Sequence, residues 1–280
     1  MAIARADPGW LAQRATADDA ARSTQLAAQL AALMPPGRVL VHDLGAGTGA
    51  MTRWLAPRLP GPQRWVLHDG DAGILRCLDL HAVTDDAGRP IVTATRVESL
   101  ASLPPDAFHG AAAVTASALL DVITADEAAR VVAACVVAAV PALFSLSVTG
   151  EVRLEPLPGA EPGAEAGEAD VAVLSAAFND HQRRDAGGRR MLGPDAVRVV
   201  AAGFAEAGWA VRTAATPWRL GPDDARLIAA WLHGWIAAAV IQRPLLAQAA
   251  GRSERRWGAW AASGLLRVTV SHEDLLAWPG

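Results

Sequence analysis

Two carboxylates flank a glycine-rich segment in the first quarter of the chain. Asp43 ends an apolar run over residues 39–43, the chain continues as Gly45-Ala46-Gly47-Thr48-Gly49, and a second apolar run ends at Asp69-Gly70. Glycines at this spacing allow positive φ and a close approach of backbone to ligand, and the last one lets a helix pack against the strand. An acid at the end of the second strand can accept from both hydroxyls of a ribose. The segment therefore predicts a βαβ unit that binds a nucleoside-like ligand at its strand ends.

Asp43 discriminates between two kinds of cofactor, because it lies two residues before the first glycine. It would repel the negative pyrophosphate of a dinucleotide, whereas a methionine-type ligand carries an ammonium and a sulfonium that it attracts. The residues thus favour a cationic ligand. An NAD-dependent oxidoreductase is kept as the alternative, since residues 45–50 also match the pattern G-x-G-x-x-A.

These residues resemble the class I S-adenosylmethionine-dependent methyltransferase family. The segment from Asp43 to Gly49 matches its first motif and Asp69 its second, and the resemblance covers residues 37–272. It implies an α/β Rossmann-like fold with a seven-stranded, mostly parallel sheet, one antiparallel strand and helices on both faces. It further implies that S-adenosyl-L-methionine is the cofactor and S-adenosyl-L-homocysteine the product. A non-catalytic relative that keeps only the cofactor pocket is a further alternative.

The resemblance also assigns the cofactor residues. It gives this role to Asp43, Gly45, Ala46, Gly47, Gly49, Asp69 and Gly70. Glu98 stands where the family places an Asp against the adenine amino group, with a solvated loop glutamate as the alternative. Ala116 and Ser117 stand where the fourth motif meets the methionine portion of the cofactor.

The chemistry expected is methyl transfer to an oxygen or nitrogen of a small molecule, with an anionic metabolite as the leading acceptor. Because a sulfonium methyl is already electrophilic, the protein mainly aligns the acceptor and excludes water. If a base takes part, His181 is the first candidate and Asp121 the second. Asn179 and Gln182 lie in the same polar cluster and are predicted to bind the acceptor; the alternative is a helix end with solvated polar groups.

Three further side chains are predicted to bind the acceptor. Arg14 and Arg22 lie eight residues apart, so they can share a helix face and reach an anion, unless both are simply solvated. Trp231 could stabilise a cation through its indole face, and the alternatives are core packing or a dimer face. His42 and His68 precede the two acids and should face away from them; we expect them to pack under a helix and predict no metal site.

The periodicity places these residues on an ordered series of elements. We expect a helical cap over residues 1–36, then one cofactor-binding domain over 37–280 with a substrate-binding insertion at about 151–193. Strands are predicted at 39–43, 65–69, 91–95, 110–115, 142–148, 209–215 and 265–271. Helices are predicted at 8–34 (one or two), 50–59, 125–139, 171–184, 193–207 and 223–249, with a mobile acidic loop at 153–170.

Composition narrows the class of protein. The 280 residues are 52% hydrophobic and 19% charged, with a net charge of −4, which suits a soluble enzyme and argues against nucleic acid as a partner. Cys77 and Cys135 show no metal-ligand spacing, and with no signal-peptide pattern this predicts a reduced, cytoplasmic protein. The uncharged apolar run at 131–144 is shorter than the roughly 20 residues that span a bilayer, so no membrane partner is expected. The expected partner is a small-molecule acceptor, and a homodimer is left open.

Overall fold

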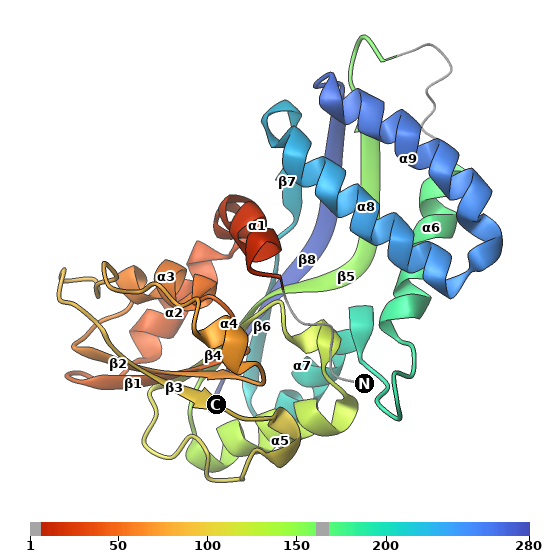
Figure 1. Cartoon of the computed structure of the whole chain (residues 1–280). Coiled ribbons are helices and arrows are strands. Elements are labelled where there is room, and N and C mark those ends of the chain that lie inside the picture. Colours follow the sequence, from red (N-terminus) through yellow and green to blue (C-terminus); the bar gives the residue numbers. More distant parts are fainter. Residues whose placement is uncertain (1–6, 161–167) are drawn as a thin grey trace.

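The chain forms a twisted central sheet with helices on both faces, seen in a computed structural model that describes residues 7–160 and 168–280 (Figure 1). The strands are β1 (Val39–Leu44), β2 (Gln63–Asp69), β3 (Val92–Val97), β4 (Ala113–Ser117), β5 (Ala142–Pro156), β6 (Ala210–Ala215), β7 (Trp218–Leu220) and β8 (Leu266–Trp278). The helices are α1 (Pro8–Ala21), α2 (Thr24–Leu33), α3 (Ala50–Leu55), α4 (Ala72–Leu75), α5 (Ala125–Ala138), α6 (Glu168–Gln182), α7 (Ala196–Glu206), α8 (Ala225–Gln242) and α9 (Ala247–Ala262).

The strand order is β3-β2-β1-β4-β5-β8-β6. The neighbouring strands β3, β2, β1, β4 and β5 run parallel to one another, and β8 is antiparallel to both β5 and β6. The predicted mostly parallel sheet with a single antiparallel strand is therefore confirmed. The short strand β7, which pairs with β8, is an eighth strand that the seven-stranded prediction did not include.

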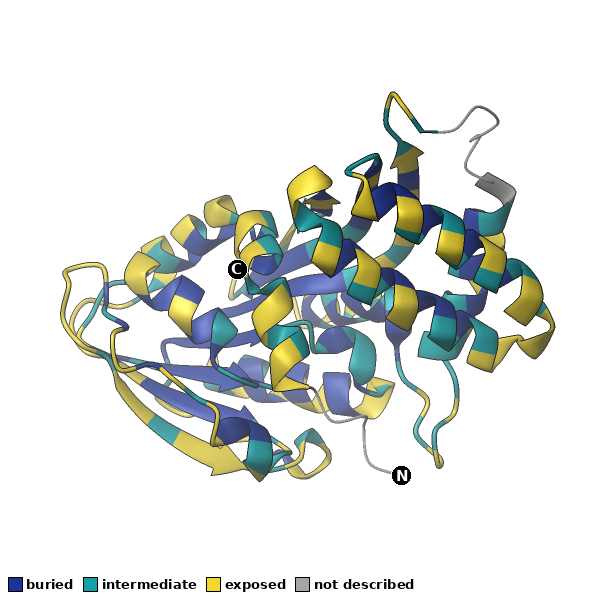
Figure 2. Ribbon diagram, turned by 45° about the horizontal axis from the view of Figure 1, so that its top comes forward, coloured by how far each residue is buried: buried dark blue, intermediate teal, exposed yellow. Residues whose placement is uncertain are grey.

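Helices cover the two faces of the parallel part of the sheet unequally. Helices α5 and α7 pack on one face, around Phe144 and Phe204, and α2 and α3 pack on the other, around Trp65 and Leu30. Figure 2 shows the central strands as buried and the outer sides of the helices as exposed. Strand β3 is the exception: α4 has only four residues, and this edge strand is largely exposed.

Strands β5 and β8 continue well beyond the parallel part and form a sheet extension, made of residues 148–156 of β5, residues 266–272 of β8, and β7 (Figure 1). The predictions that these strands end at residues 148 and 271 are wrong. The inner face of the extension carries Leu154, Val268 and Trp218, which pack with α6, α8 and α9 into a second core. Alternation along β8 places Arg267 and Thr269 on the outer face.

Two register irregularities bend β5 where it leaves the parallel part. They lie between Phe144 and Ser147 and between Val148 and Val152, opposite β8. Leu146 has a φ of 57° and Gly150 a φ of 84°, both in the left-handed region. Extra residues in one strand of a pair bend it and increase its twist. The extension therefore leaves the parallel part at the carboxyl end of its strands, the end at which ligands bind in sheets of this kind.

Two predicted segments differ from the structure. The single helix expected at 223–249 is two helices, α8 and α9, because Pro244 has no N–H to continue the helix and starts the one-turn η6 (Pro244–Leu246). The loop expected at 153–170 begins as strand up to Pro156, and α6 starts at Glu168. Residues 161–167 of that predicted loop lie outside the described residues.

Helix α8, with the turn before it, is the one described helix whose length and composition would allow a membrane span, at Pro222–Gln242. Six of its side chains are buried against the rest of the protein: Leu227, Ile228, Leu232, Trp235, Ile236 and Ala239. Burial of this face against α6 and α9 gives α8 the role of a core helix of the sheet extension.

The N-terminal segment forms two capped helices. Asp7 accepts from the Trp10 N–H at the start of α1, and Ser23 accepts from the Leu26 N–H at the start of α2. Trp10 of α1 packs on Trp218 of β7, with ring centroids 6.4 Å apart. Helix α1 thus lies against the sheet extension, whereas α2 joins the core of the parallel part.

Candidate functional site

The glycine-rich turn connects β1 to α3 as predicted. Gly45, Gly47 and Gly49 have φ values of 61°, 55° and 81°, which L side chains rarely adopt. A Cβ on Gly45 would lie 2.8 Å from Leu119 Cδ1, and one on Gly49 would lie 3.0 Å from Leu78 and Leu80. The turn therefore needs glycine for both conformation and space.

Asp69 lies at the end of β2 and closes over this turn. Its Oδ2 accepts from the Gly47 N–H at 3.0 Å, and its Oδ1 accepts from the Asp71 N–H at 2.9 Å. A carboxylate has about four acceptor positions, so two remain for hydroxyls of a ligand. The Gly47 N–H, a group that would hold a phosphate in a dinucleotide site, already has an anion as its partner.

Asp43 is fully buried beneath the turn, which corrects the prediction that its carboxylate meets the ligand. Its two oxygens accept from the Thr52 hydroxyl at 2.8 Å and the Thr115 hydroxyl at 2.9 Å. Burial raises the pKa of Asp43 to about 6, and the hydrogen bonds from the two threonines oppose that rise. Asp43 therefore ties β1 to α3 and β4, and its charge acts on the turn only through space.

Glu98 follows β3 and ends a hydrogen-bonded chain with two histidines. Its carboxylate pairs with Nδ1 of His68, and Nε2 of His68 lies 2.8 Å from Nδ1 of His42. Both rings are buried, and the His42 ring packs edge-to-face with the Phe108 ring, with ring centroids 5.2 Å apart. Burial lowers the pKa of both histidines, that of His42 to about 4. Both hydrogen bonds can form with neutral rings if the proton of each ring is on Nδ1. Nδ1 of His42 then donates to Nε2 of His68, and Nδ1 of His68 donates to the Glu98 carboxylate.

The histidines face away from the two motif acids, since Asp43 contacts α3 and His42 contacts Phe108 in the core on the α5 side. Their function is to hold Glu98 at the strand ends. Within residues 7–160 and 168–280, no group of three or more His, Cys, Asp or Glu side chains is arranged to hold a metal ion.

Backbone strain marks the end of β4 and the bend of β5. Ala118, just after Ser117, has a φ of 51° and donates its N–H to the Ser145 carbonyl at 2.9 Å. Leu146, next to Ser145, has a φ of 57° and donates to Asp274 Oδ1 at 2.7 Å. Non-glycine residues in this region persist only where the surroundings hold them, and they gather at ligand sites.

Asp274 of β8 holds this region, and the sequence analysis did not single it out. The buried carboxylate also accepts from the Ser23 N–H at 2.9 Å and the Thr216 hydroxyl at 2.8 Å. It therefore links α2, β5 and the segment between β6 and β7. Asp274 directly follows Ser271, His272 and Glu273, so its residue type did not set it apart from its polar neighbours in the sequence.

Arg22 lies beside the cofactor turn, apart from the acceptor position predicted for it. It donates to the Ser117 hydroxyl at 3.1 Å, pairs with Asp19, and stacks 5.6 Å above the Trp54 ring. Its side chain is buried, and its Nε has no partner among the described residues. Burial lowers the pKa of Arg22, while its charge in turn opposes the raised pKa of Asp43.

Arg14 forms an ion pair within α1, and this corrects the prediction that it binds a carboxylate of the acceptor. Its guanidinium donates to both oxygens of Asp18, at 2.8 and 3.1 Å, and lies 5.1 Å above the Trp218 ring. Asp18 also accepts from Trp218 Nε1 at 3.0 Å. The cluster fastens α1 to β7, and its charge is balanced internally.

Asp121 and Gln182 are in contact, and Asn179 lies on the same side of α6 as Gln182. Asp121 lies in η3 (Leu120–Val122) after β4, and Gln182 of α6 donates to its Oδ2 at 3.4 Å. Asn179, one turn earlier on α6, donates to the Gly150 carbonyl at 3.0 Å. Burial raises the pKa of Asp121. This group lies after the end of β4 and beside the bend of β5 at Gly150.

The remaining two candidates lie elsewhere. His181 precedes Gln182, so its side chain projects about 100° around the helix from the Asp121 side; burial lowers its pKa, with Arg184 as the second cause. Trp231 stacks on Trp235 with ring centroids 5.2 Å apart, within the core of α8 and α9. Core packing, the alternative for Trp231, is what the structure shows.

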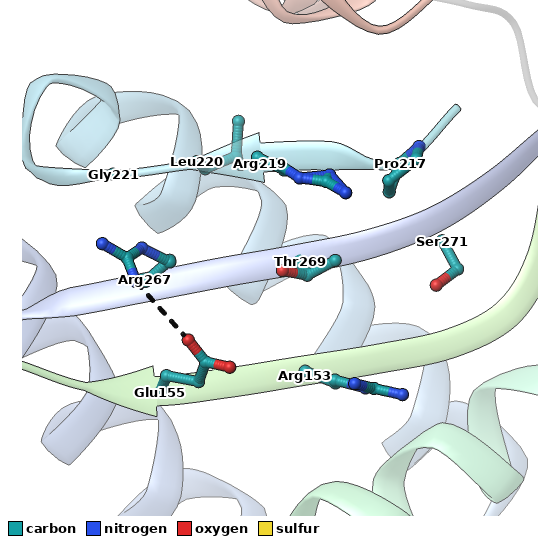
Figure 3. Close-up of a pocket in the computed structure, with 9 residues that line it drawn as sticks. All are labelled: Arg153, Glu155, Pro217, Arg219, Leu220, Gly221, Arg267, Thr269 and Ser271. Atoms are coloured by element: carbon teal, nitrogen blue, oxygen red, sulfur yellow. Dashed lines mark ion pairs between the residues drawn. The ribbon is translucent and has the colours of Figure 1, made fainter. Parts of the chain in front are cut away.

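Two surface hollows flank the sheet extension. One lies on its outer face and is lined by Arg153, Arg219, Arg267 and neighbouring polar residues (Figure 3), where Arg267 pairs with Glu155 at 3.7 Å. The other is a groove of about 720 Å³ between residues 149–155 of β5 and α6, and Ser175 contributes to its wall. Ser175 lies one helix turn before Asn179, on the same side of α6.

Comparisons with solved structures find similar chains. A S-adenosylmethionine-dependent methyltransferase from Geobacter sulfurreducens, solved with S-adenosyl-L-homocysteine, is 14% identical over 98% of this chain and 99% of that chain, with a TM-score of 0.43. A cyclopropane synthase from Mycobacterium tuberculosis is 13% identical over 90% of this chain and 81% of that chain, with a TM-score of 0.45. No family model and no curated protein matches the chain. The fold assignment therefore rests on the strand order of the chain itself.

Proposed function

We propose that the chain is an S-adenosyl-L-methionine-dependent methyltransferase that acts on a small molecule. The observation that carries the proposal is the closure of the glycine turn by Asp69, whose carboxylate occupies the Gly47 N–H. A pyrophosphate would have to displace that anion, whereas a ribose can hydrogen-bond to it. This favours a cofactor with a ribose and no phosphate over NAD.

The residues around the turn fit this cofactor. The three glycines with positive φ shape the turn at the end of β1, and Asp69 offers acceptors for the ribose. Glu98, held by His68, would accept from the adenine amino group. Arg22 has an unsatisfied buried Nε and lies beside Ser117, so it would hold the carboxylate of the methionine portion.

The cofactor supplies an electrophilic methyl group. The protein contributes alignment and the exclusion of water, and a proton acceptor where the nucleophile carries a proton. Asp121 suits this last role better than His181, because it lies at the end of β4 and its raised pKa favours uptake of a proton. Two free cysteines, one of them exposed, agree with a reducing compartment such as the cytoplasm. We propose no membrane or nucleic-acid partner and leave a homodimer open.

Replacing Arg22 tests the proposal at the methionine end of the cofactor. Arg22→Met should weaken S-adenosyl-L-methionine binding about 10- to 100-fold, because a charge-assisted hydrogen bond contributes about 1.5–3 kcal/mol. Binding of 5′-methylthioadenosine, which lacks the amino-acid portion, should not change, and it reports whether the variant keeps its fold. Both dissociation constants are measured by calorimetry.

Arg58→Met is the matched control, since Arg58 stacks on the same Trp54 ring, at 4.4 Å. It should leave both dissociation constants within about twofold. An equal loss for the two ligands in Arg22→Met, or no loss for either, contradicts the assignment. Wild-type protein that binds neither ligand contradicts the proposed function as a whole.

A further inference from the structure

The side of α6 that faces β5 and Asp121 carries three polar residues at the spacing of one helix face, Ser175, Asn179 and Gln182. Asn179 Nδ2 donates to the Gly150 carbonyl, and Gln182 Nε2 donates to the Asp121 carboxylate. The Asn179 side chain lies close to the backbone of β5 at Gly150, where an added Cβ would lie 2.6 Å from Asn179 Nδ2. This face is therefore built around polar contacts.

The partners fix the orientation of both amides. A backbone carbonyl and an ionised carboxylate only accept hydrogen bonds, so each amide must turn its NH₂ group toward them. Asn179 Oδ1 and Gln182 Oε1 are then left over, and both atoms are buried without a donor in the described part of the chain. Buried polar atoms in a folded protein normally have a partner, so two unsatisfied acceptors on one helix face indicate a missing donor.

The charge at this place is also unbalanced. Arg14 is the cation that acts on Asp121, but its guanidinium binds both oxygens of Asp18. No salt bridge to Asp121 is formed by the described residues. Asp121 therefore contributes a negative charge beside two more hydrogen-bond acceptors, and no cation among residues 7–160 and 168–280 forms an ion pair with it.

We propose that the methyl acceptor is a primary or secondary amine, which binds as its ammonium form with Asp121 as the counterion and Gln182 and Asn179 as hydrogen-bond acceptors. An ammonium supplies two or three donors and a positive charge, an alcohol supplies one donor, and a carboxylate supplies none. The proposal rests on the proposed function, and it replaces the anionic acceptor expected from Arg14 and Arg22. The groove of about 720 Å³ that begins at Ser175 has the size of a small-molecule site and would hold the rest of the acceptor.

The transfer step balances with these groups. One N–H proton of the ammonium passes to Asp121, which frees the lone pair of the nitrogen. The nitrogen then forms a bond to the methyl carbon as the bond from that carbon to sulfur breaks, and the electron pair stays on sulfur as a neutral thioether. Asp121 finally releases the proton to water. The raised pKa of Asp121 is suited to this transient uptake.

A protein-free metabolite extract of bacterial cells, incubated with the enzyme and methyl-tritiated S-adenosyl-L-methionine, tests the class of acceptor. One portion of the extract is first treated with an N-hydroxysuccinimide ester of acetic acid, which blocks amines. We expect label in the small molecules of the untreated extract, stable to mild base, and at least about a tenfold loss of label in the treated extract. Label that survives amine blocking, or that base releases as methanol, overturns the amine acceptor and leaves the methyltransferase function standing. Binding of the cofactor with no label in either portion contradicts both.

Asp121→Asn tests the counterion with the labelled amine isolated from that extract. It should raise KM for the amine about 100-fold, because it leaves a buried ammonium without its partner, while cofactor affinity stays within about twofold. Asp126→Asn, which removes an exposed acid at the start of α5, is the matched control and should leave both unchanged. An unchanged KM in Asp121→Asn overturns the role of Asp121.

Discussion

Three carboxylates hold the site together through different donors; Asp43 and Asp274 are buried, and Asp69 is partly exposed. Asp43 takes two threonine hydroxyls, Asp69 takes two backbone N–H groups at the rim of the turn, and Asp274 joins α2, β5 and the segment before β7. The position of Asp43 and Asp69 at strand ends could be predicted from apolar runs and glycine spacing. That Asp43 points into the protein depends on Thr115, seventy-two residues away, and no local pattern contains that contact.

The buried His42 makes stability depend on pH, and the sign follows from its lowered pKa. An unfolded histidine takes a proton below a pH of about 6.5, while folded His42 does so only near pH 4. The contribution of neutral, buried His42 to the free energy of unfolding is therefore complete above pH 6.5, and it is lost as the pH falls from 6.5 to 4. At pH 5 the loss is about 2 kcal/mol. His42→Asn keeps a donor for His68, so between pH 7 and pH 5 this variant should lose about 2 kcal/mol less than the wild type, measured by urea unfolding.

The comparison isolates His42 from the other titrating groups. Asp43 has a pKa raised to about 6, which acts with the opposite sign, and His272 has a pKa lowered to about 4, but the wild type and the variant share both. His109→Asn replaces an exposed histidine and should keep the wild-type pH dependence. Parallel pH curves for the wild type and His42→Asn would be incompatible with a neutral, buried His42.

At the scale of elements, the turn after β1 was predictable because glycine spacing specifies backbone conformation directly. The sheet extension was not, for two reasons. Residues 150–159 mix glycine, proline and charge, which is typical of loops, while their alternation toward the second core is visible only beside β8. Pro244, by contrast, was a local signal for the break between α8 and α9, and proline chemistry alone would have predicted it.

Gly150 joins the bend of β5 to α6, and its replacement tests that junction. Gly150→Ala and Gly188→Ala both place alanine at nearly the same positive φ, +84° and +81°, which costs about 1–2 kcal/mol in each. A Cβ added at Gly150 would clash with the Asn179 amide, whereas a Cβ added at Gly188 would have no atom within 4 Å. Gly150→Ala should therefore lose about 1–3 kcal/mol more unfolding free energy, from the displaced Asn179 hydrogen bond.

The Gly150→Ala and Gly188→Ala variants should also differ in methyltransferase activity. Gly150→Ala displaces Asn179 and should reduce methyl transfer to the acceptor, with cofactor affinity unchanged, while Gly188→Ala should keep both. If the two variants lose equal stability and equal activity, then Asn179 does not depend on the close approach at Gly150.

At the scale of the whole molecule, the site lies where two cores meet. The residues proposed to bind the cofactor lie around the parallel part of the sheet, and those proposed to bind the acceptor lie in η3 after β4 and in α6 beside the sheet extension. The mostly parallel sheet with one antiparallel strand followed from the family resemblance. The closure of α1 over the extension did not, because the Asp18 to Trp218 hydrogen bond links residues 200 positions apart.

The proposed function requires that the glycine turn closed by Asp69 binds S-adenosyl-L-methionine. Calorimetric titration of the wild-type protein with S-adenosyl-L-methionine, S-adenosyl-L-homocysteine and NAD tests it most directly. We predict that the first two bind at one site per chain, at least about 100-fold more tightly than NAD, which would have to displace Asp69 from Gly47 at a price of a few kcal/mol. Tight binding of NAD, with weak or no binding of the other two, would contradict the account.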